Sequence, residues 1–158
     1  MSQKILIAMD ESEYSTKAVR YVADTVNPKA VEITLFSVLP EAPGTGLEKE
    51  PSLIPLFQSR VTELKGLTEE KRKIMESATA SARKILEGAG IPDNKIGVKI
   101  QVKKVGIARD IMFEAQEGKY SAIVVGRRGV SAIKEFMFGS ISNKVVSFAR
   151  NCTVWVVD

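Results

Sequence analysis

The feature of the sequence that most constrains its fold is a set of short apolar runs, separated by stretches with helical periodicity. The runs "ILIAM" after Lys4 and "AIVVG" before two arginines show little of the polar alternation of a half-exposed strand. Such runs are typical of strands buried on both faces of a parallel sheet. Five strands are predicted, at Lys4–Met9, Val31–Leu39, Val98–Val105, Ser121–Val125 and Thr153–Val157.

The intervals between these strands carry apolar residues three or four positions apart, which predicts amphipathic helices. In the second of them, Lys71 is the one charged residue in an otherwise apolar stripe. Strands that alternate with helices predict an α/β fold, in which a five-stranded parallel sheet carries helices on both faces and has right-handed crossovers. The predicted helices run from the candidate N-cap Ser12 to just before Pro28, from near Val61 to Ala89, from Ile107 to Ala115, and from Ile141 to Ala149.

The chain of 158 residues is long enough for one domain with a substantial core, and a single domain over residues 1–158 is expected. Pro40–Pro55 contains four of the six prolines, so we expect a variable loop at about 40–60. The apolar runs are far shorter than the ~20 residues that span a membrane. The N-terminal residues have the pattern of a first strand, not that of a signal peptide.

The inventory of side chains argues against several kinds of chemistry. The chain has no histidine, which disfavours a zinc site and a Ser-His-Asp hydrolase. One cysteine, Cys152, rules out an internal disulfide and fits a reducing cytoplasm. The formal net charge of +4 is not gathered in a basic tail, so no nucleic-acid partner is expected.

The segment "GRRGVSAIKEFMFGS", residues 126–140, has the chemistry of an anion site. Gly126 and Gly129 flank two arginines directly after the fourth predicted strand. Glycine lets the backbone approach a ligand closely, and Arg127 and Arg128 carry charge that can neutralise a polyphosphate. This half of the segment therefore predicts a phosphate-binding turn.

The other half of the segment opens the last predicted helix at Gly139-Ser140. The free N–H groups and the dipole of a helix start favour an anion, and Ser140 and Ser142 add hydroxyl donors. Asp10 follows the first strand. In a doubly wound sheet, ligands bind at the carboxyl ends of strands where the winding reverses. We therefore expect Asp10 and Gly126 to share one crevice, provided that the first and fourth strands are neighbours.

These residues resemble the universal stress protein family, in the ATP-binding branch with the motif Gly-x2-Gly-x9-Gly-Ser/Thr. The motif falls on "VVGRRG", nine further residues, and "GSIS". The stretches "ILIAMDES", "VGIARDIMFEAQEGKYSAIVVG" and "NCTVWVVD" are also similar to the family, so the resemblance covers the chain apart from residues 40–60. It implies a Rossmann-like sheet of the adenine nucleotide alpha hydrolase kind, with strand order 3-2-1-4-5.

The resemblance also implies a nucleotide site. Adenine would lie near the end of the second strand, Asp10 would contact ribose or a metal ion, and the glycine motif would wrap the ribose and phosphates. The expected ligand is ATP, or AMP or ADP in the protein as isolated, with Mg²⁺ or Mn²⁺. The residues expected at this site are Asp10, Ser12, Val38, Leu39, Gly126, Arg127, Arg128, Gly129, Gly139, Ser140, Ile141 and Ser142.

A homodimer is implied as well, because family members commonly pair through the last strand. In this chain that strand is Val154, Trp155, Val156 and Val157, and an exposed apolar edge favours a partner. The chain departs from the family at Glu11, which replaces the usual glycine and places negative charge near the expected phosphates. Arg127 replaces a small residue, and Thr153 a proline.

Three functions follow from these patterns. The first is an ATP-binding stress-response factor that acts as a nucleotide-dependent regulator. The second is a weak ATP hydrolase, although the chain offers no histidine base and no Walker lysine after the glycines. The third is a dimerising interaction module that binds no nucleotide.

Overall fold

A computed structural model describes residues 2–40, 55–128 and 138–158. The described chain folds into strands β1 (Gln3–Ala8), β2 (Val31–Leu39), β3 (Ile96–Val102), β4 (Ala122–Gly126) and β5 (Thr153–Val157). The helices α1 (Glu13–Thr25), α2 (Pro55–Gly88), α3 (Ile107–Glu117) and α4 (Ser140–Phe148) alternate with them. Short 3₁₀ turns at Pro28–Ala30 and Asp93–Lys95 precede β2 and β3.

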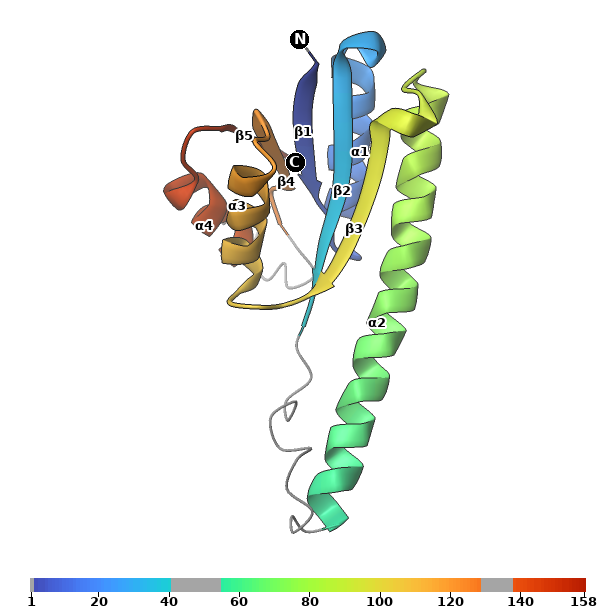
Figure 1. The fold of residues 1–158 in the computed structure, drawn as a ribbon, viewed down its shortest axis with the longest axis vertical. Coiled ribbons are helices and arrows are strands. Elements are labelled where there is room, and N and C mark those ends of the chain that lie inside the picture. The colour runs from blue at the N-terminus through green and yellow to red at the C-terminus, as the bar shows by residue number, and fades with distance from the viewer. Residues whose placement is uncertain (1, 41–54, 129–137) are drawn as a thin grey trace.

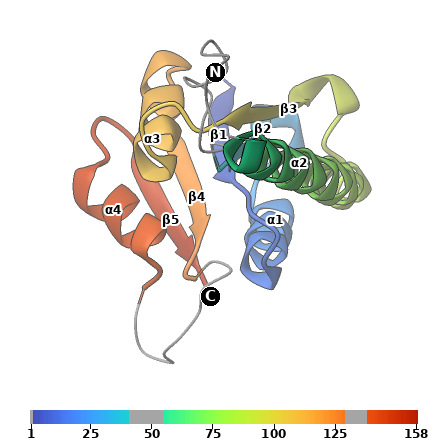
Figure 2. The same cartoon turned by 90° about the horizontal axis from the view of Figure 1, so that it is seen from below.

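The strands form one parallel sheet in the order β3-β2-β1-β4-β5, which confirms the expected order. Helices α1 and α2 cover one face of this sheet, and α3 and α4 cover the other (Figure 1 and Figure 2). Ile5 pairs with Ile33 of β2 and with Ala122 of β4, so β1 lies in the middle of the sheet. The unbroken apolar runs are thus explained by burial on both faces.

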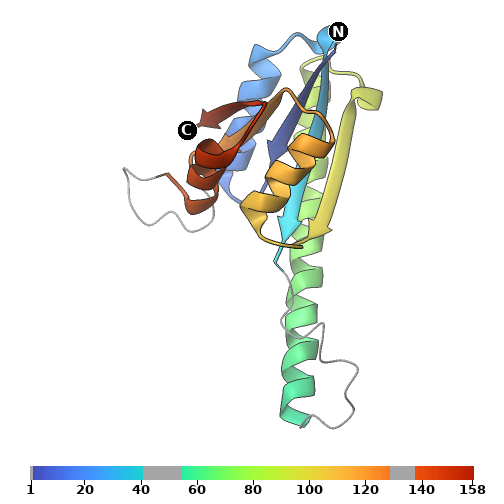
Figure 3. The same cartoon turned by 60° about the vertical axis from the view of Figure 1, so that its left-hand side comes forward.

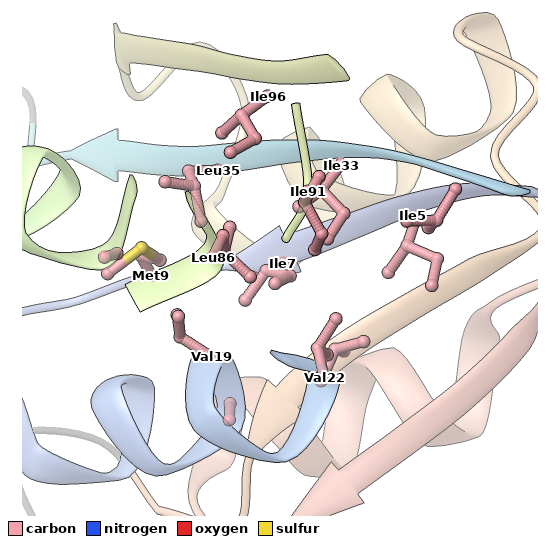
Figure 4. Packing of buried hydrophobic residues seen from close by; sticks show 14 of the residues in the cluster. Ile5, Ile7, Met9, Val19, Val22, Ile33, Leu35, Leu86, Ile91 and Ile96 are labelled. Atoms are coloured by element: carbon pink, nitrogen blue, oxygen red, sulfur yellow. The ribbon is translucent and has the colours of Figure 1, made fainter. Parts of the chain in front are cut away.

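Successive residues of β1 serve the two cores alternately, because side chains of a strand point to opposite faces. Ile5 and Ile7 belong to the core under α1 and α2, where they lie near Val22 and Leu86 (Figure 4). Leu6 belongs to the core under α3 and α4. All three β1 side chains are fully buried, which makes this strand the common support of both layers.

The largest differences from the predicted element boundaries are at the end of β3 and at the start of α2. Strand β3 ends at Val102 instead of Val105, because the buried carboxylate of Asp110 accepts hydrogen bonds from the backbone N–H groups of Lys104 and Val105. These bonds turn the chain out of the sheet and into α3. Helix α2 begins at Pro55 and not near Val61, since proline at the first helical position costs no hydrogen bond.

The early start of α2 changes the expected loop at about 40–60. Residues 55–60 of that range are helical, and residues 41–54 lie outside the described part. With 34 residues, the helix is about 50 Å long at the usual rise per residue, and it extends well past the carboxyl ends of the strands (Figure 3). Among the described helices, none is both long and apolar enough to cross a membrane.

The apolar side chains of β5 have a different explanation from the partner chain that the sequence suggests. Trp155 and Val157 pack against the core under α1 and α2, and Val154 and Val156 pack against the core under α3 and α4. The apolar character of this strand therefore serves the chain's own cores. What β5 offers a partner is the backbone of an edge strand.

Replacement of Ile7 by alanine tests the central position of β1. We expect Ile7→Ala to lower the free energy of unfolding by about 2–5 kcal/mol, because a cavity forms in a fully buried site. The matched control is Ile74→Ala on α2, where the side chain is 46% exposed and the loss should stay below about 1 kcal/mol. Urea unfolding of both variants without nucleotide measures the difference. Equal losses would contradict the assignment of Ile7 to the core.

Candidate functional site

A cavity of about 290 Å³ lies at the carboxyl ends of β1, β2 and β4. Because β1 and β4 are neighbours in the sheet, the chain segments that follow them meet there, as expected for the switch point of a doubly wound sheet. Asp10 and Gly126 both line this cavity. The crevice that the sequence predicted is present.

Most of the predicted site residues line this one cavity. Ser12 is not part of the lining but contacts Asp10. Arg127 points elsewhere, and Gly129 lies outside the described residues. The predicted residues that do line the cavity are Asp10, Val38, Leu39, Gly126, Arg128, Gly139, Ser140, Ile141 and Ser142.

The carboxylate of Asp10 is held in one orientation by two serines. Its Oδ1 accepts hydrogen bonds from the backbone N–H of Ser12 at 2.9 Å, from the Ser12 hydroxyl, and from the Ser15 hydroxyl at 2.7 Å. The Asp10 N–H donates in turn to Ser15 Oγ at 2.8 Å. Ser12 precedes α1 without capping it through its side chain. No described residue donates to Oδ2, which remains able to accept a ligand hydroxyl or bind a cation.

The start of α4 is fastened to the end of β4. The Gly139 N–H donates to the carbonyl of Arg127 at 2.9 Å, and the Ser142 hydroxyl donates to the carbonyl of Gly126 at 2.5 Å. The first intrahelical bond runs from the Asn143 N–H to the Gly139 carbonyl, so the amides of the preceding turn have no intrahelical acceptor. This turn, which lines the cavity, has the arrangement that binds anions at helix starts.

One predicted donor is already used within the protein. Ser142 is buried, and its only hydroxyl proton goes to the Gly126 carbonyl. Its role is therefore to hold α4 against β4, whereas the exposed Ser140 keeps a hydroxyl available at the cavity.

The two consecutive arginines point to different partners. The Arg127 guanidinium forms an ion pair with Asp158 at 2.9 Å and lies 5.8 Å from the centre of the Phe138 ring. Its backbone N–H completes the pairing with β5 by donating to the Val157 carbonyl at 2.6 Å. The structure does not bring this side chain into the cavity lining, because these contacts hold it at the β5 edge.

Arg128 does line the cavity. Its Nε is buried and has no hydrogen-bond partner among the described residues. An unsatisfied buried donor costs about 1–3 kcal/mol, and an anionic oxygen that reached Nε would offset this cost. Arg128 is thus the member of the pair that is suited to a phosphate.

Gly126 has a packing reason for lacking a side chain. A Cβ at this position would lie 2.7 Å from Tyr14 Cβ and 3.0 Å from the Tyr14 carbonyl carbon. Its φ is outside the left-handed region, so the glycine is required by the close passage of α1 over β4. The sequence interpretation, which assigned Gly126 to the approach of a ligand, missed this contact.

Other parts of the cavity were also missed by sequence reasoning. Helix α2 supplies Lys71 and Met75, and α3 supplies Ile107 and Ile111. Lys71 interrupts the apolar stripe of the predicted helix, and this interruption could have indicated that α2 contributes to the cavity. With Val38, Leu39 and Ile141, the α3 residues give the cavity an apolar part, while Asp10, Arg128 and the α4 turn give it a polar part.

Comparison with known proteins assigns the chain to a family. A model described as "Universal stress protein family" matches residues 1–158. The chain belongs to the universal stress protein family. It is 30% identical to universal stress protein YxiE of Bacillus subtilis (strain 168) over 158 residues, which is 99% of each chain.

Solved structures of similar fold include relatives with bound nucleotides. Protein MJ0577 is 30% identical, with a TM-score of 0.72 and coverage of 99% of this chain and 96% of that one. A universal stress protein from Archaeoglobus fulgidus in complex with dAMP is 16% identical, with a TM-score of 0.63 and coverage of 100% and 98%. Another family member, in complex with cAMP, is 18% identical with a TM-score of 0.61 and coverage of 99% and 96%.

The packing role of Gly126 can be separated from its place in the cavity. We expect Gly126→Ala to destabilise the fold by about 1–3 kcal/mol, because the added methyl group must displace the first turn of α1. In Gly88→Ala, by contrast, the new Cβ meets nothing within 4 Å, and alanine favours the helix, so stability should be unchanged or higher. Thermal unfolding of both variants without nucleotide provides the comparison. An unchanged Tm for Gly126→Ala would refute the steric explanation.

Proposed function

We propose that this universal stress protein binds ATP in the cavity at the ends of β1, β2 and β4, and acts as a nucleotide-dependent regulator in the stress response. The observation that carries the proposal is that Arg128, whose buried Nε has no hydrogen-bond partner among the described residues, lines the same cavity as the start of α4. Together they form a preorganised site for an anion. The dAMP and cAMP found in structural relatives support a nucleotide as its source.

The two parts of the cavity match the two ends of a nucleotide. The apolar lining formed by Val38, Leu39 and Ile111 suits the adenine ring. The fixed carboxylate of Asp10 suits a ribose hydroxyl or a metal ion, and Arg128 with the α4 turn suits the phosphates. If the purified protein contains AMP or ADP in place of ATP, these nucleotides would make the same contacts.

A divalent cation fits the same arrangement. The lining carboxylates are those of Asp10 and Glu11, and the described residues form no group of three potential metal-binding side chains. Mg²⁺ commonly binds through one or two carboxylates together with phosphate oxygens and water. We assign Asp10 as the protein ligand of Mg²⁺ or Mn²⁺, whose charge would offset that of the phosphates.

We further propose a homodimer through the open edge of β5. Arg127 connects the candidate site to the β5 edge, because its N–H donates to the Val157 carbonyl and its carbonyl accepts from the Gly139 N–H. Ligand binding at the α4 turn and dimer formation at β5 would therefore both affect Arg127. This supports a regulatory protein more than a hydrolase, since the lining offers no histidine as a base.

The first test is the identification and affinity of the nucleotide. Purified protein, denatured in acid and analysed by chromatography, should release adenine nucleotide, and calorimetry with ATP and Mg²⁺ should give saturable binding. The absence of both would refute the proposed function.

The two arginines provide a second, matched test. We expect Arg128→Ala to weaken ATP binding by about 10- to 100-fold, the loss usual for a hydrogen bond to a charged group. Arg127→Ala should change the dissociation constant by less than about threefold, because its guanidinium is paired with Asp158 at the β5 edge. Calorimetry on both variants measures the two dissociation constants. A larger loss of ATP affinity in Arg127→Ala than in Arg128→Ala would refute the assignment of Arg128 to the phosphates.

A further inference from the structure

Helix α2 has one face that changes its role along its length. Met75, Thr79, Ala82 and Leu86 are spaced by four, three and four residues, and all are buried. Lys71 lies four residues before Met75 and therefore continues the same face. Both Lys71 and Met75 line the cavity, so the stripe changes from apolar to cationic where it reaches the candidate site.

The charged residues of the lining are Asp10, Glu11, Lys71 and Arg128. Asp10 is held by the hydrogen bonds from Ser12 and Ser15. Glu11 and Lys71 are both exposed, and neither has an ion-pair partner among the described residues. Without Lys71 the two carboxylates would outnumber Arg128 among the charged side chains of the lining, which would weaken its attraction for an anion.

We propose that Lys71 is a specificity-determining residue of this site, which offsets the charge of Glu11 and makes the cavity prefer nucleoside triphosphates to monophosphates. The proposal rests on the proposed function, because it concerns the same ligand. An exposed ammonium acts on an anion through Coulomb attraction that grows with the charge of the ligand. Its effect should therefore rise from AMP to ADP to ATP and vanish for adenosine.

The position of Lys71 also explains how Glu11 can stand beside a phosphate site. A carboxylate in the lining, such as that of Glu11, disfavours a polyphosphate unless positive charge compensates for it. A divalent cation supplies that charge when it is bound with the nucleotide. Lys71 supplies it permanently from α2, so its contribution should be largest when the metal is removed.

The experiment measures dissociation constants for adenosine, AMP, ADP and ATP by calorimetry, with Mg²⁺ and with EDTA. In EDTA, Lys71→Gln should weaken ATP binding about five- to tenfold, ADP less, and adenosine not at all. Glu11→Gln should strengthen ATP binding, and the double variant should return close to the wild-type value. The control Lys73→Gln, an exposed lysine of α2 outside the cavity lining, should leave all four constants unchanged.

Several outcomes would overturn the inference. In a wild-type protein that binds ATP, an unchanged ATP constant in Lys71→Gln would refute it. Equal losses of affinity for adenosine and for ATP in Lys71→Gln would show that Lys71 acts through packing. In that case Lys71→Arg, which keeps the charge, should bind ATP as weakly as Lys71→Gln does. A wild-type protein that binds none of the four ligands would instead refute the proposed function itself.

Discussion

The parallel pairing of β1 with β4 is the contact on which the candidate site depends. β1 is followed by α1 on one face of the sheet, and β4 is followed by α4 on the other. The two connections diverge from adjacent strand ends, and the space between them becomes the cavity. This pairing requires β1 to be apolar on both faces, because it lies between two helical layers. The same burial that stabilises the sheet thus brings Asp10 and Gly126 together.

Hydrogen bonds tie the part of the cavity at the start of α4 to the sheet. The N–H of Arg127 continues the pairing of β4 with β5, and its carbonyl accepts the bond from Gly139. The Ser142 hydroxyl adds a second tie from α4 to Gly126. The amides at the start of α4 are therefore oriented before any ligand binds, which reduces the cost of ordering them. The Asp10 carboxylate is fixed in a comparable way by Ser12 and Ser15.

Local pattern was sufficient to predict the order of the elements, because apolar runs and helical stripes report burial directly. The strand order needed the resemblance to a family. The sequence prediction was wrong where residues outside an element determine its local structure. Asp110 ends β3 by taking backbone N–H groups that a strand pattern assigns to the sheet. Gly126 is a glycine because Tyr14 passes close to it, a contact between residues more than a hundred positions apart.

The candidate site shows the same division between local and distant information. Motif spacing pointed to the α4 turn, and the end of the first predicted strand pointed to Asp10; both line the cavity. It could not separate Arg127 from Arg128. Arg127 pairs with Asp158 at the β5 edge, whereas Arg128 lines the cavity, and the dipeptide encodes neither contact. Ser142 illustrates a third case, because it lines the cavity as predicted while its hydroxyl donates to the Gly126 carbonyl.

Lys71 shows how a break in a pattern can carry more information than the pattern. A stripe that only packs against a sheet has no reason to include an ammonium group, since burial of an unpaired charge is costly. The stripe of α2 becomes cationic one turn beyond Met75, which is 5% exposed and still part of the core. The end of the apolar stripe therefore marks where the helix passes from supporting the sheet to lining the cavity. One charged residue in an amphipathic helix could therefore have indicated a wall of the candidate site that the glycine motif does not reveal.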